Sequence, residues 1–162
     1  MTFYLKRLVY ILFIMTSFNS AANESSEVAR VLDSLHQFAA ESDAENYFSL
    51  FTDDAIFIGT DVNEYWTINE FKSYALPFFN KGKGWVYVSK ERDIRFSGAG
   101  DVAWFHEVLD SKSYGTSRGT GVLVLTTGGQ WKIAQYHLTF PLPNDLAAEI
   151  TDRIKTFEAE KK

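Results

Sequence analysis

The sequence predicts an α+β fold in which helices come first and an antiparallel sheet follows. In the first half of the chain, apolar residues recur every three or four positions in segments that open with helix-capping residues. In the second half, four segments rich in β-branched and aromatic residues are separated by short turns. Helices and strands segregated in this way are typical of a sheet packed against helices.

Residues 1–22 have the order of features found in a secretory signal peptide. Lys6 and Arg7 form a short basic region, residues 8–15 are an unbroken apolar run, and residues 20–22 supply small side chains for cleavage. The alternative is a retained membrane anchor, although the run is short for crossing a bilayer. The chain contains no cysteine, which excludes lipidation at the cleavage site, a disulfide framework and thiol catalysis. We therefore expect a periplasmic or secreted bacterial protein with no membrane attachment after cleavage.

The charge of the expected mature chain is acidic. Removing Lys6 and Arg7 from the 16 basic residues leaves 14 against 21 acidic residues, a formal charge of −7. Since no basic stripe is interleaved with aromatic residues, nucleic acid is not an expected partner. Residues 23–144 suit one domain whose core would take up the aromatic residues, 16% of the chain, and residues 145–162 form a predicted C-terminal helix or tail.

Two helices are predicted at the start of this domain. From Ser25 to Glu41, apolar residues share one side of a helix and charged residues the other. Ser42 and Glu45 then have the spacing of a capping box, in which the two side chains satisfy free amide groups at a helix start. The second helix is expected to end near Phe51.

A short hairpin and a third helix come next. Residues 55–59 are predicted to form a short buried strand, and Asp61-Val62-Asn63 a turn. Thr67 and Glu70 form another capping box, which opens a helix with Phe71, Tyr74, Ala75 and Phe78 on its apolar side. Pro77 should kink or end that helix, because proline lacks a backbone N–H and clashes with the preceding turn.

The rest of the domain is predicted to be a four-strand antiparallel meander. Its strands cover Trp85 to Phe96, Val102 to Asp110, Ser117 to Thr126 and Trp131 to Phe140. Pro141 and Pro143 should end the last strand, since neither can donate to a ladder. The helix expected from Asp145 has an apolar stripe formed by Leu146, Ile150, Ile154 and Phe157.

The last two strands form a long hairpin whose register follows from its turn. Gly128-Gly129 suits a two-residue turn, and if Thr127 faces Gln130, then Val122 faces Gln135, Thr120 faces His137 and Arg118 faces Thr139. Because side chains alternate along a strand, one face would carry a polar cluster at the end far from the turn and an apolar patch near it. The cluster is Arg118, Thr120, Gln135 and His137, and the patch includes Val122, Val124, Trp131 and Ile133. The other face would carry Tyr136, Leu138 and Phe140.

Several motifs resemble the SnoaL-like branch of the nuclear transport factor 2-like superfamily, over roughly residues 28–144. They are Leu50 to Ala55, Gly59-Thr60-Asp61 with Glu64-Tyr65-Trp66, Asp101 to Phe105, Arg118 to Gly121, and Gln130 to Leu138. The resemblance implies a cone in which a curved antiparallel sheet packs against three N-terminal helices. A cavity between the concave face and the helices would have polar groups from the last strands and the short hairpin near its mouth. The superfamily includes isomerases, cyclases, dehydratases and hydrolases as well as binding and assembly domains, so fold alone does not give a reaction.

Arg118 and His137 are candidate catalytic residues at the mouth of the expected cavity. The imidazole of His137 could act as a general base, and the planar fork of Arg118 could bind a carboxylate or a developing oxyanion. The structural alternatives are a core histidine bonded to Thr120 or a carboxylate, and an internal salt bridge from Arg118 to Asp61, Glu64 or Glu107.

Two carboxylates near the short hairpin are further candidates for acid and base work. Asp61 and Glu64 flank the turn, where isomerase and hydrolase members of the resembled fold use such a group. The alternative is ordinary turn chemistry. Asp53 and Asp54 are better explained by a junction between a helix and a strand.

Trp66, Trp104, Thr120 and Gln135 are candidate ligand-binding residues, although large aromatic residues in strands more often belong to the core. In the strand from Val102 to Asp110, alternation places Trp104 and His106 on one face and Phe105 and Glu107 on the other. The sequence leaves open which of the two pairs points into the cavity. His36 is expected at a helix surface or a subunit contact.

No cofactor is expected. The three histidines are scattered singly, and the sequence has neither a glycine-rich phosphate loop nor a serine nucleophile elbow. The first hypothesis is a dimeric protein that binds a small apolar or carboxylate-bearing molecule. The second is a cofactor-free isomerase, cyclase or hydrolase that uses His137, Asp61 or Glu64 with Arg118. The third is a non-catalytic domain that assembles, with itself as a homodimer or with another protein, through an outer sheet face bearing Tyr136, Leu138 and Phe140.

Overall fold

The computed structural model describes residues 24–161, and it confirms the α+β class. The predicted signal peptide lies outside the described residues. A helix over residues 24–41 comes first. It is followed by α2 (Ala44–Ser49), β1 (Phe51–Ile58), β2 (Tyr65–Thr67), α3 (Ile68–Phe79), β3 (Val88–Phe96), β4 (Val102–Ser111), β5 (Gly115–Leu125), β6 (Trp131–Thr139) and α4 (Asn144–Glu160). No helix in this described part of the chain is long and apolar enough to cross a membrane.

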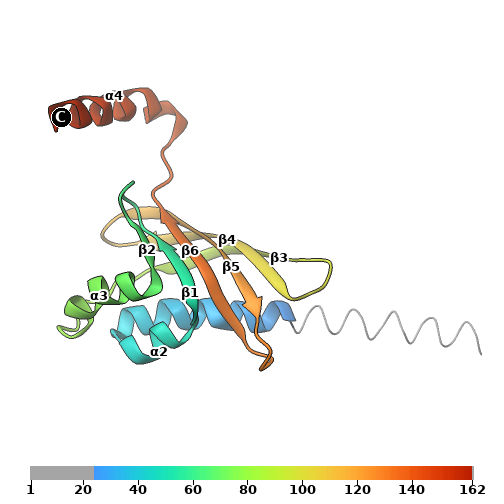
Figure 1. The fold of residues 1–162 in the computed structure, drawn as a ribbon. Helices are drawn as coiled ribbons and strands as arrows, with labels where there is room; N and C mark the ends of the chain where they lie inside the picture. Colours follow the sequence, from blue (N-terminus) through green and yellow to red (C-terminus); the bar gives the residue numbers. More distant parts are fainter. Residues whose placement is uncertain (1–23, 162) are drawn as a thin grey trace, which may run out of the picture.

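The six strands form one sheet in the order β2-β1-β6-β5-β4-β3. The predicted meander is confirmed as β3 to β6, and β1 extends it by pairing in parallel with β6. The helix over residues 24–41, α2 and α3 gather on one side of the curved sheet (Figure 1). We call the face toward these helices the inner face, which carries the buried Phe105, Glu107, Leu123 and Ile133, and the opposite face the outer face.

The ends of the helices follow capping chemistry, with one correction. The predicted box at Ser42 and Glu45 is wrong, because Asp43 caps α2 by accepting a hydrogen bond from the Asn46 backbone N–H at 3.1 Å. Ser42 instead takes a positive φ of 60°, and its hydroxyl accepts a hydrogen bond from the Gly84 backbone N–H at 2.8 Å. An aspartate one position later offers the same capping chemistry, so the sequence pattern is ambiguous there.

The second predicted box is confirmed. The Glu70 side chain accepts from the Thr67 backbone N–H at 2.8 Å, and the Thr67 hydroxyl accepts from the Glu70 backbone N–H at 3.4 Å. Pro77 lies in the last turn of α3, and the helix ends two residues later at Phe79. The helix thus continues through the proline and ends within one turn of it.

The hairpin of β5 and β6 has the predicted register only in the half far from its turn. Arg118 faces Thr139, Thr120 faces His137 and Val122 faces Gln135, as expected, but Leu123 then faces Ile133. The shift leaves one extra residue, Ala134, in β6, which is a β-bulge.

The turn of this hairpin also differs from the prediction. Residues 126–130 lie between the strands, and of the two glycines only Gly129 has a positive φ, 74°. The Gly129 N–H donates to the Thr126 carbonyl and the Thr126 N–H to the Gln130 carbonyl, each at 2.9 Å. The predicted two-residue turn is therefore wrong, because the turn is longer and needs only one left-handed residue.

The core between the inner face and the helices is dominated by aromatic rings. The ring of Tyr47 in α2 lies with its centroid 5.1–6.3 Å from five others, those of Phe48, Phe51, Phe71, Phe79 and Trp85. Phe57 of β1 stacks on Phe71 of α3 with centroids 3.7 Å apart. Each such pair contributes about 0.5–1.5 kcal/mol beyond area burial. The rings thus hold α2 and α3 against β1.

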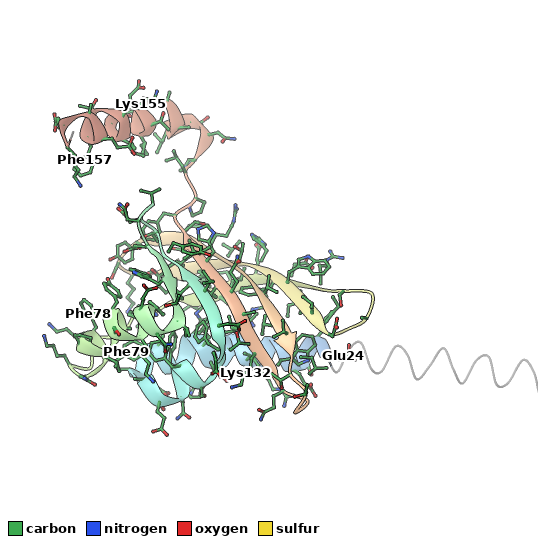
Figure 2. The ribbon with its side chains drawn as sticks, viewed as in Figure 1. Glu24, Phe78, Phe79, Lys132, Lys155 and Phe157 are labelled. Carbon is green, nitrogen blue, oxygen red and sulfur yellow. The ribbon has the colours of Figure 1, made fainter. Side chains whose placement is uncertain are left out.

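The C-terminal helix α4 is amphipathic but has no buried residue. It follows the segment from Phe140 to Pro143 and stands apart from the sheet (Figure 1). Lys155 and Phe157 project from opposite sides of it (Figure 2), and the apolar Leu146, Ile154 and Phe157 are exposed. The packed body therefore ends with β6.

Candidate functional site

An open pocket of about 220 Å³ lies between the inner face of the sheet and α3. Its lining comes from β1, β2 and the turn between them, from α3 and the segment before β3, from the turn between β4 and β5, and from the end of β6 with Phe140 just beyond it. Eight of the twelve lining residues are aromatic: Phe57, Trp66, Phe71, Tyr74, Trp85, Tyr87, Tyr114 and Phe140. The volume is below the roughly 300–1,000 Å³ typical of pockets for drug-sized ligands, so the pocket suits a small molecule.

A smaller void of about 20 Å³ continues from this pocket toward the core. The two spaces share Phe57, Trp85, Tyr87 and Leu138 in their linings. The inner void also reaches three polar side chains, His36, Tyr47 and Tyr136. It has room for about one water molecule.

Behind the inner void lies a buried polar network centred on Glu107, whose side chain is fully buried. Its Oε1 accepts a hydrogen bond from Nε2 of His36 at 2.8 Å and a longer one from the Tyr136 hydroxyl at 3.3 Å. Its Oε2 accepts from Nε of Arg92 at 3.0 Å. Because a carboxylate can only accept, the bond fixes the proton of His36 on Nε2.

Arg92 connects this network to the first helix. Its Nη1 lies 2.7 Å from the Asp33 carboxylate and donates to the Ala29 carbonyl at 3.2 Å. Burial alone would raise the pKa of Glu107, but the hydrogen bonds and charges of His36 and Arg92 outweigh it and hold that pKa below its ordinary value. Glu107 is therefore ionised at neutral pH and compensated by its neighbours.

Three tyrosines around the two spaces, Tyr47, Tyr87 and Tyr136, have a raised pKa and are neutral phenols at physiological pH. Burial, followed by the negative charge of Glu107, raises the pKa of Tyr136 well above its ordinary value. Burial also raises the pKa of Tyr47, and burial with the nearby Tyr114 raises that of Tyr87 to about 12. Such phenols can donate hydrogen bonds but do not serve as bases near pH 7.

Glu64 is the carboxylate that lines the pocket. Its half-buried side chain folds over Gly59, where an added Cβ would collide with Oε2. Oε2 accepts a hydrogen bond from the Asp61 backbone N–H at 3.1 Å, and the backbone of Glu64 bonds both Asp61 and Gly59. The turn thus holds this carboxylate at the pocket wall.

The polar cluster predicted on the hairpin does form, but not in the pocket. Arg118, Thr120, Gln135 and His137 share a face, as their pairing in the sheet requires. In β5 the buried residues are Ser117, Gly119, Gly121 and Leu123, which alternate with Arg118 and Thr120. The cluster therefore lies on the outer face. The expectation that these side chains line the cavity is therefore wrong.

The bulge at Ala134 is the physical reason for this error in β6, whereas the alternation of β5 is unbroken. One extra residue reverses the side to which the following side chains point. Trp131 and Ile133 are buried on the inner face, whereas Gln135 and His137 lie on the outer face. Tyr136 is buried on the inner side and Leu138 lines the pocket, which corrects their predicted place on the outer face. Phe140 stacks on Tyr114 at the pocket rim.

The orientation of β4 decides the candidates on that strand. Phe105 and Glu107 point inward, and Trp104 and His106 point outward, with Trp104 47% exposed. Trp104 is therefore absent from the pocket lining, and only Trp66 of the predicted ligand-binding residues is part of it.

Asp61 has the structural role of a turn residue. Its Oδ1 accepts hydrogen bonds from the backbone and side-chain nitrogens of Asn63, both at 2.9 Å, and these bonds lower its pKa. The side chain is exposed and does not line the pocket, unlike that of Glu64. None of the salt bridges proposed for Arg118 is present among the described residues, since Glu107 pairs with Arg92 and His36.

His36 and Arg92 are the polar residues that the sequence reasoning missed. The expectation of a surface histidine is wrong, since the His36 side chain is only 12% exposed and bonds Glu107 across 71 positions of sequence. Two features of the sequence indicate their burial. His36 follows the apolar Leu35, and Arg92 alternates with Ile94 and Phe96, so that all three side chains of the strand point to the same, inner face. No group of three or more potential metal ligands occurs within residues 24–161.

Comparisons with known proteins agree with this architecture. The family model for the SnoaL-like domain matches residues 28–143. No curated protein matches the chain.

Three solved structures illustrate the shared fold. A nuclear transport factor 2-like protein of unknown function from Pseudomonas putida is 18% identical, with 76% of this chain and 90% of that chain covered and a TM-score of 0.61. A provisionally assigned scytalone dehydratase from Novosphingobium aromaticivorans is 15% identical over 77% and 89%, with a TM-score of 0.65. A provisionally assigned ketosteroid isomerase from Shewanella frigidimarina is 17% identical over 67% and 91%, with a TM-score of 0.55.

At these identities the three neighbours show the fold and not a shared activity. The family match over residues 28–143 and the common architecture lead to one conclusion: the chain belongs to the SnoaL-like domain family and has the nuclear transport factor 2-like fold.

Proposed function

We propose that the protein binds a small, largely apolar molecule in the aromatic pocket. The observation that carries this proposal is a space of about 220 Å³ whose lining is two-thirds aromatic and opens to solvent at the rim formed by Tyr114 and Phe140. Concave, mostly apolar sites with a few polar groups are the usual form of small-molecule sites. Here the polar groups are the Glu64 carboxylate and the phenols of the lining tyrosines.

A matched pair of tryptophan variants tests this proposal. Trp66→Leu removes a pocket wall, and Trp104→Leu makes the same change on the outer face. A library of small apolar compounds is screened for thermal stabilisation, and the affinity of the hits is measured by calorimetry. We expect Trp66→Leu to weaken binding about tenfold or more, since losing an aromatic anchor costs roughly 2 kcal/mol, and Trp104→Leu to leave it unchanged. Equal effects of the two changes would refute the assignment of the pocket.

A second candidate function is cofactor-free acid–base catalysis in the same pocket. It is supported by Glu64, whose Oε1 has no hydrogen-bond partner among the described residues and could move a proton of a bound substrate. Glu64→Gln should lower a rate by about 10²–10⁴-fold while leaving substrate affinity nearly unchanged. His137→Ala, on the outer face, is the control and should keep full activity. A rate that falls only in the His137 variant would place the chemistry elsewhere.

A homodimer through the outer face is a further proposal. It is supported by apolar side chains there that are only partly buried in the single chain, among them Ile56, Ile58, Val122 and Trp104. Val122→Arg would place a charge at the centre of that contact and should convert a dimer into a monomer in light scattering. A wild-type monomer at all accessible concentrations would contradict this proposal.

We also propose that the mature protein is periplasmic or secreted. The order of basic, apolar and small residues over positions 1–22 supports it. N-terminal sequencing of protein from the periplasmic fraction should begin at Asn23. A full-length chain recovered from membranes would favour a retained anchor instead.

A further inference from the structure

The pocket has an unbalanced charge. Among residues 24–161, its lining contains one carboxylate, Glu64, and no Lys, Arg or His. The basic residues that the sequence predicts at its mouth, Arg118 and His137, lie on the outer face of the sheet. A bound anion would therefore meet a like charge and no counter-charge, whereas a bound cation would meet an opposite charge in a partly desolvated site.

The aromatic lining also favours a positive charge. The face of an aromatic ring carries negative electrostatic potential, which attracts ammonium groups, and tryptophan does so best. Two tryptophans and three tyrosines line the same space: Trp66, Trp85, Tyr74, Tyr87 and Tyr114. One such contact changes affinity by about 2- to 30-fold, depending on desolvation. Several rings around one space form the arrangement known as an aromatic cage.

The position of Glu64 is built into the hairpin between β1 and β2. The Asp61 N–H holds Oε2, and the absence of a side chain at Gly59 leaves the room that the carboxylate occupies. The backbone N–H of Gly59 donates to the Glu64 carbonyl at 2.8 Å, and that of Glu64 to the Asp61 carbonyl at 2.9 Å. Oε1 has no hydrogen-bond partner in the described chain. One carboxylate oxygen is thus fixed and the other is available to a ligand.

We propose that the pocket selects small organic cations, that is, amines or quaternary ammonium compounds with compact apolar substituents. This inference rests on the proposed ligand-binding function and names the ligand class of the same site. Glu64 supplies the counter-charge, and the rings supply both apolar contact and the attraction for the cation.

Three probes of similar shape and different charge test the proposal. They are choline, neohexyl alcohol, which replaces the nitrogen of choline by carbon, and the anion of tert-butylacetic acid. Affinities for the purified protein are measured by calorimetry and by ligand-observed NMR. We expect choline to bind about tenfold or more tightly than the neutral alcohol, and the anion to bind most weakly.

Two variants, each lacking one carboxylate, distinguish the effect of the Glu64 charge on choline binding from the effect of the net charge of the protein. Glu64→Gln should weaken choline binding about fivefold or more and leave the neutral alcohol unaffected. Glu91→Gln removes a charge from an exposed position on β3 and should change neither affinity. Equal loss of choline affinity in both variants would mean that net charge, and not Glu64, attracts the cation, which would overturn the assignment.

The outcomes distinguish this inference from the proposed function on which it rests. Equal affinities for choline and the neutral alcohol, both lost in Trp66→Leu, would overturn cation selection and leave the apolar pocket intact. Tightest binding of the anion would also overturn it. Failure of all three probes to bind at millimolar concentrations would count against both proposals.

Discussion

Replacing the buried Glu107 by glutamine should destabilise the protein by about 3 kcal/mol. The carboxylate has no exposure to solvent, and it accepts hydrogen bonds from His36, Arg92 and Tyr136. Removing one partner of a buried ion pair typically costs about 3–5 kcal/mol, because the remaining charge is left uncompensated. Glutamine keeps the shape and one acceptor, which places the expected cost at the lower end.

The geometry explains why glutamine cannot replace the carboxylate fully. All three partners donate to Glu107, so the amide NH₂ group must face a donor. If the amide oxygen stays with Arg92, His36 has to move its proton to Nδ1 in order to accept. This rearrangement limits the loss but removes the charge that balances Arg92.

Chemical denaturation at pH 7 measures the free energy of unfolding of both proteins. A loss of about 3 kcal/mol corresponds to a fall in Tm on the order of 10 °C for a domain of this size. Glu91→Gln on the exposed face of β3 is the control and should stay within about 0.5 kcal/mol of wild type. A cost below about 1 kcal/mol for Glu107→Gln would refute the view that this network anchors β3 and β4 to the first helix.

The same pair of proteins has a predictable pH dependence. The pKa of Glu107 is lowered in the folded protein, so its stabilising contribution is fully present above its ordinary value of 4.5. That contribution is lost as pH falls through the lower, folded value. The difference between wild type and Glu107→Gln should therefore be constant near neutrality and shrink below about pH 4.5. A difference that instead widened on acidification would mean that the carboxyl is protonated in the native protein.

Three further changes test the remaining parts of the fold. Gly121→Ala should destabilise the protein by about 1–3 kcal/mol in urea titrations, because a Cβ there would collide with the Gln135 carbonyl. Gly98 has open space around it, so Gly98→Ala should be nearly neutral. Equal effects of the two changes would contradict the close packing at Gly121. Thr67→Ala should cost about 1 kcal/mol through loss of the α3 cap, and an unchanged Tm would argue against the cap. Deleting residues 144–162 should leave the Tm of the body within about 2 °C, since α4 has no buried residue; a large fall would show that α4 packs on the body.

Local chemistry in the sequence was sufficient for the order and type of most elements. The Thr67 and Glu70 pair defined the start of α3, and alternation with glycine turns defined the meander from β3 to β6. These signals depend on residues a few positions apart, so they are readable without a fold. The cap of α2 is Asp43, one residue after the predicted Ser42, because both side chains can accept a hydrogen bond from a free backbone N–H.

The composition of the pocket depended on contacts that no short segment contains. Trp66 and Glu64 were candidates from their motif, but Tyr87, Tyr114 and Phe140 join them only when three separate segments meet. The His36 and Glu107 bond likewise links a helix to a strand 71 residues later.

The order of the amino acids was enough to predict the fold class, the family resemblance and the placement of Arg118 and His137 on one face of the sheet. Which face of the sheet they occupy depends on how the strands pack against the helices. Alternation along a strand predicts which side chains share a face. The single extra residue at Ala134, however, reverses the face to which the later side chains of β6 point. The imidazole of His137 therefore lies on the outer face. The guanidinium of Arg118 lies there because of the unbroken alternation of β5, and the carboxylate of Glu64 lines the pocket. A one-residue irregularity that periodicity does not reveal thus decided which side chains of β6 face the pocket.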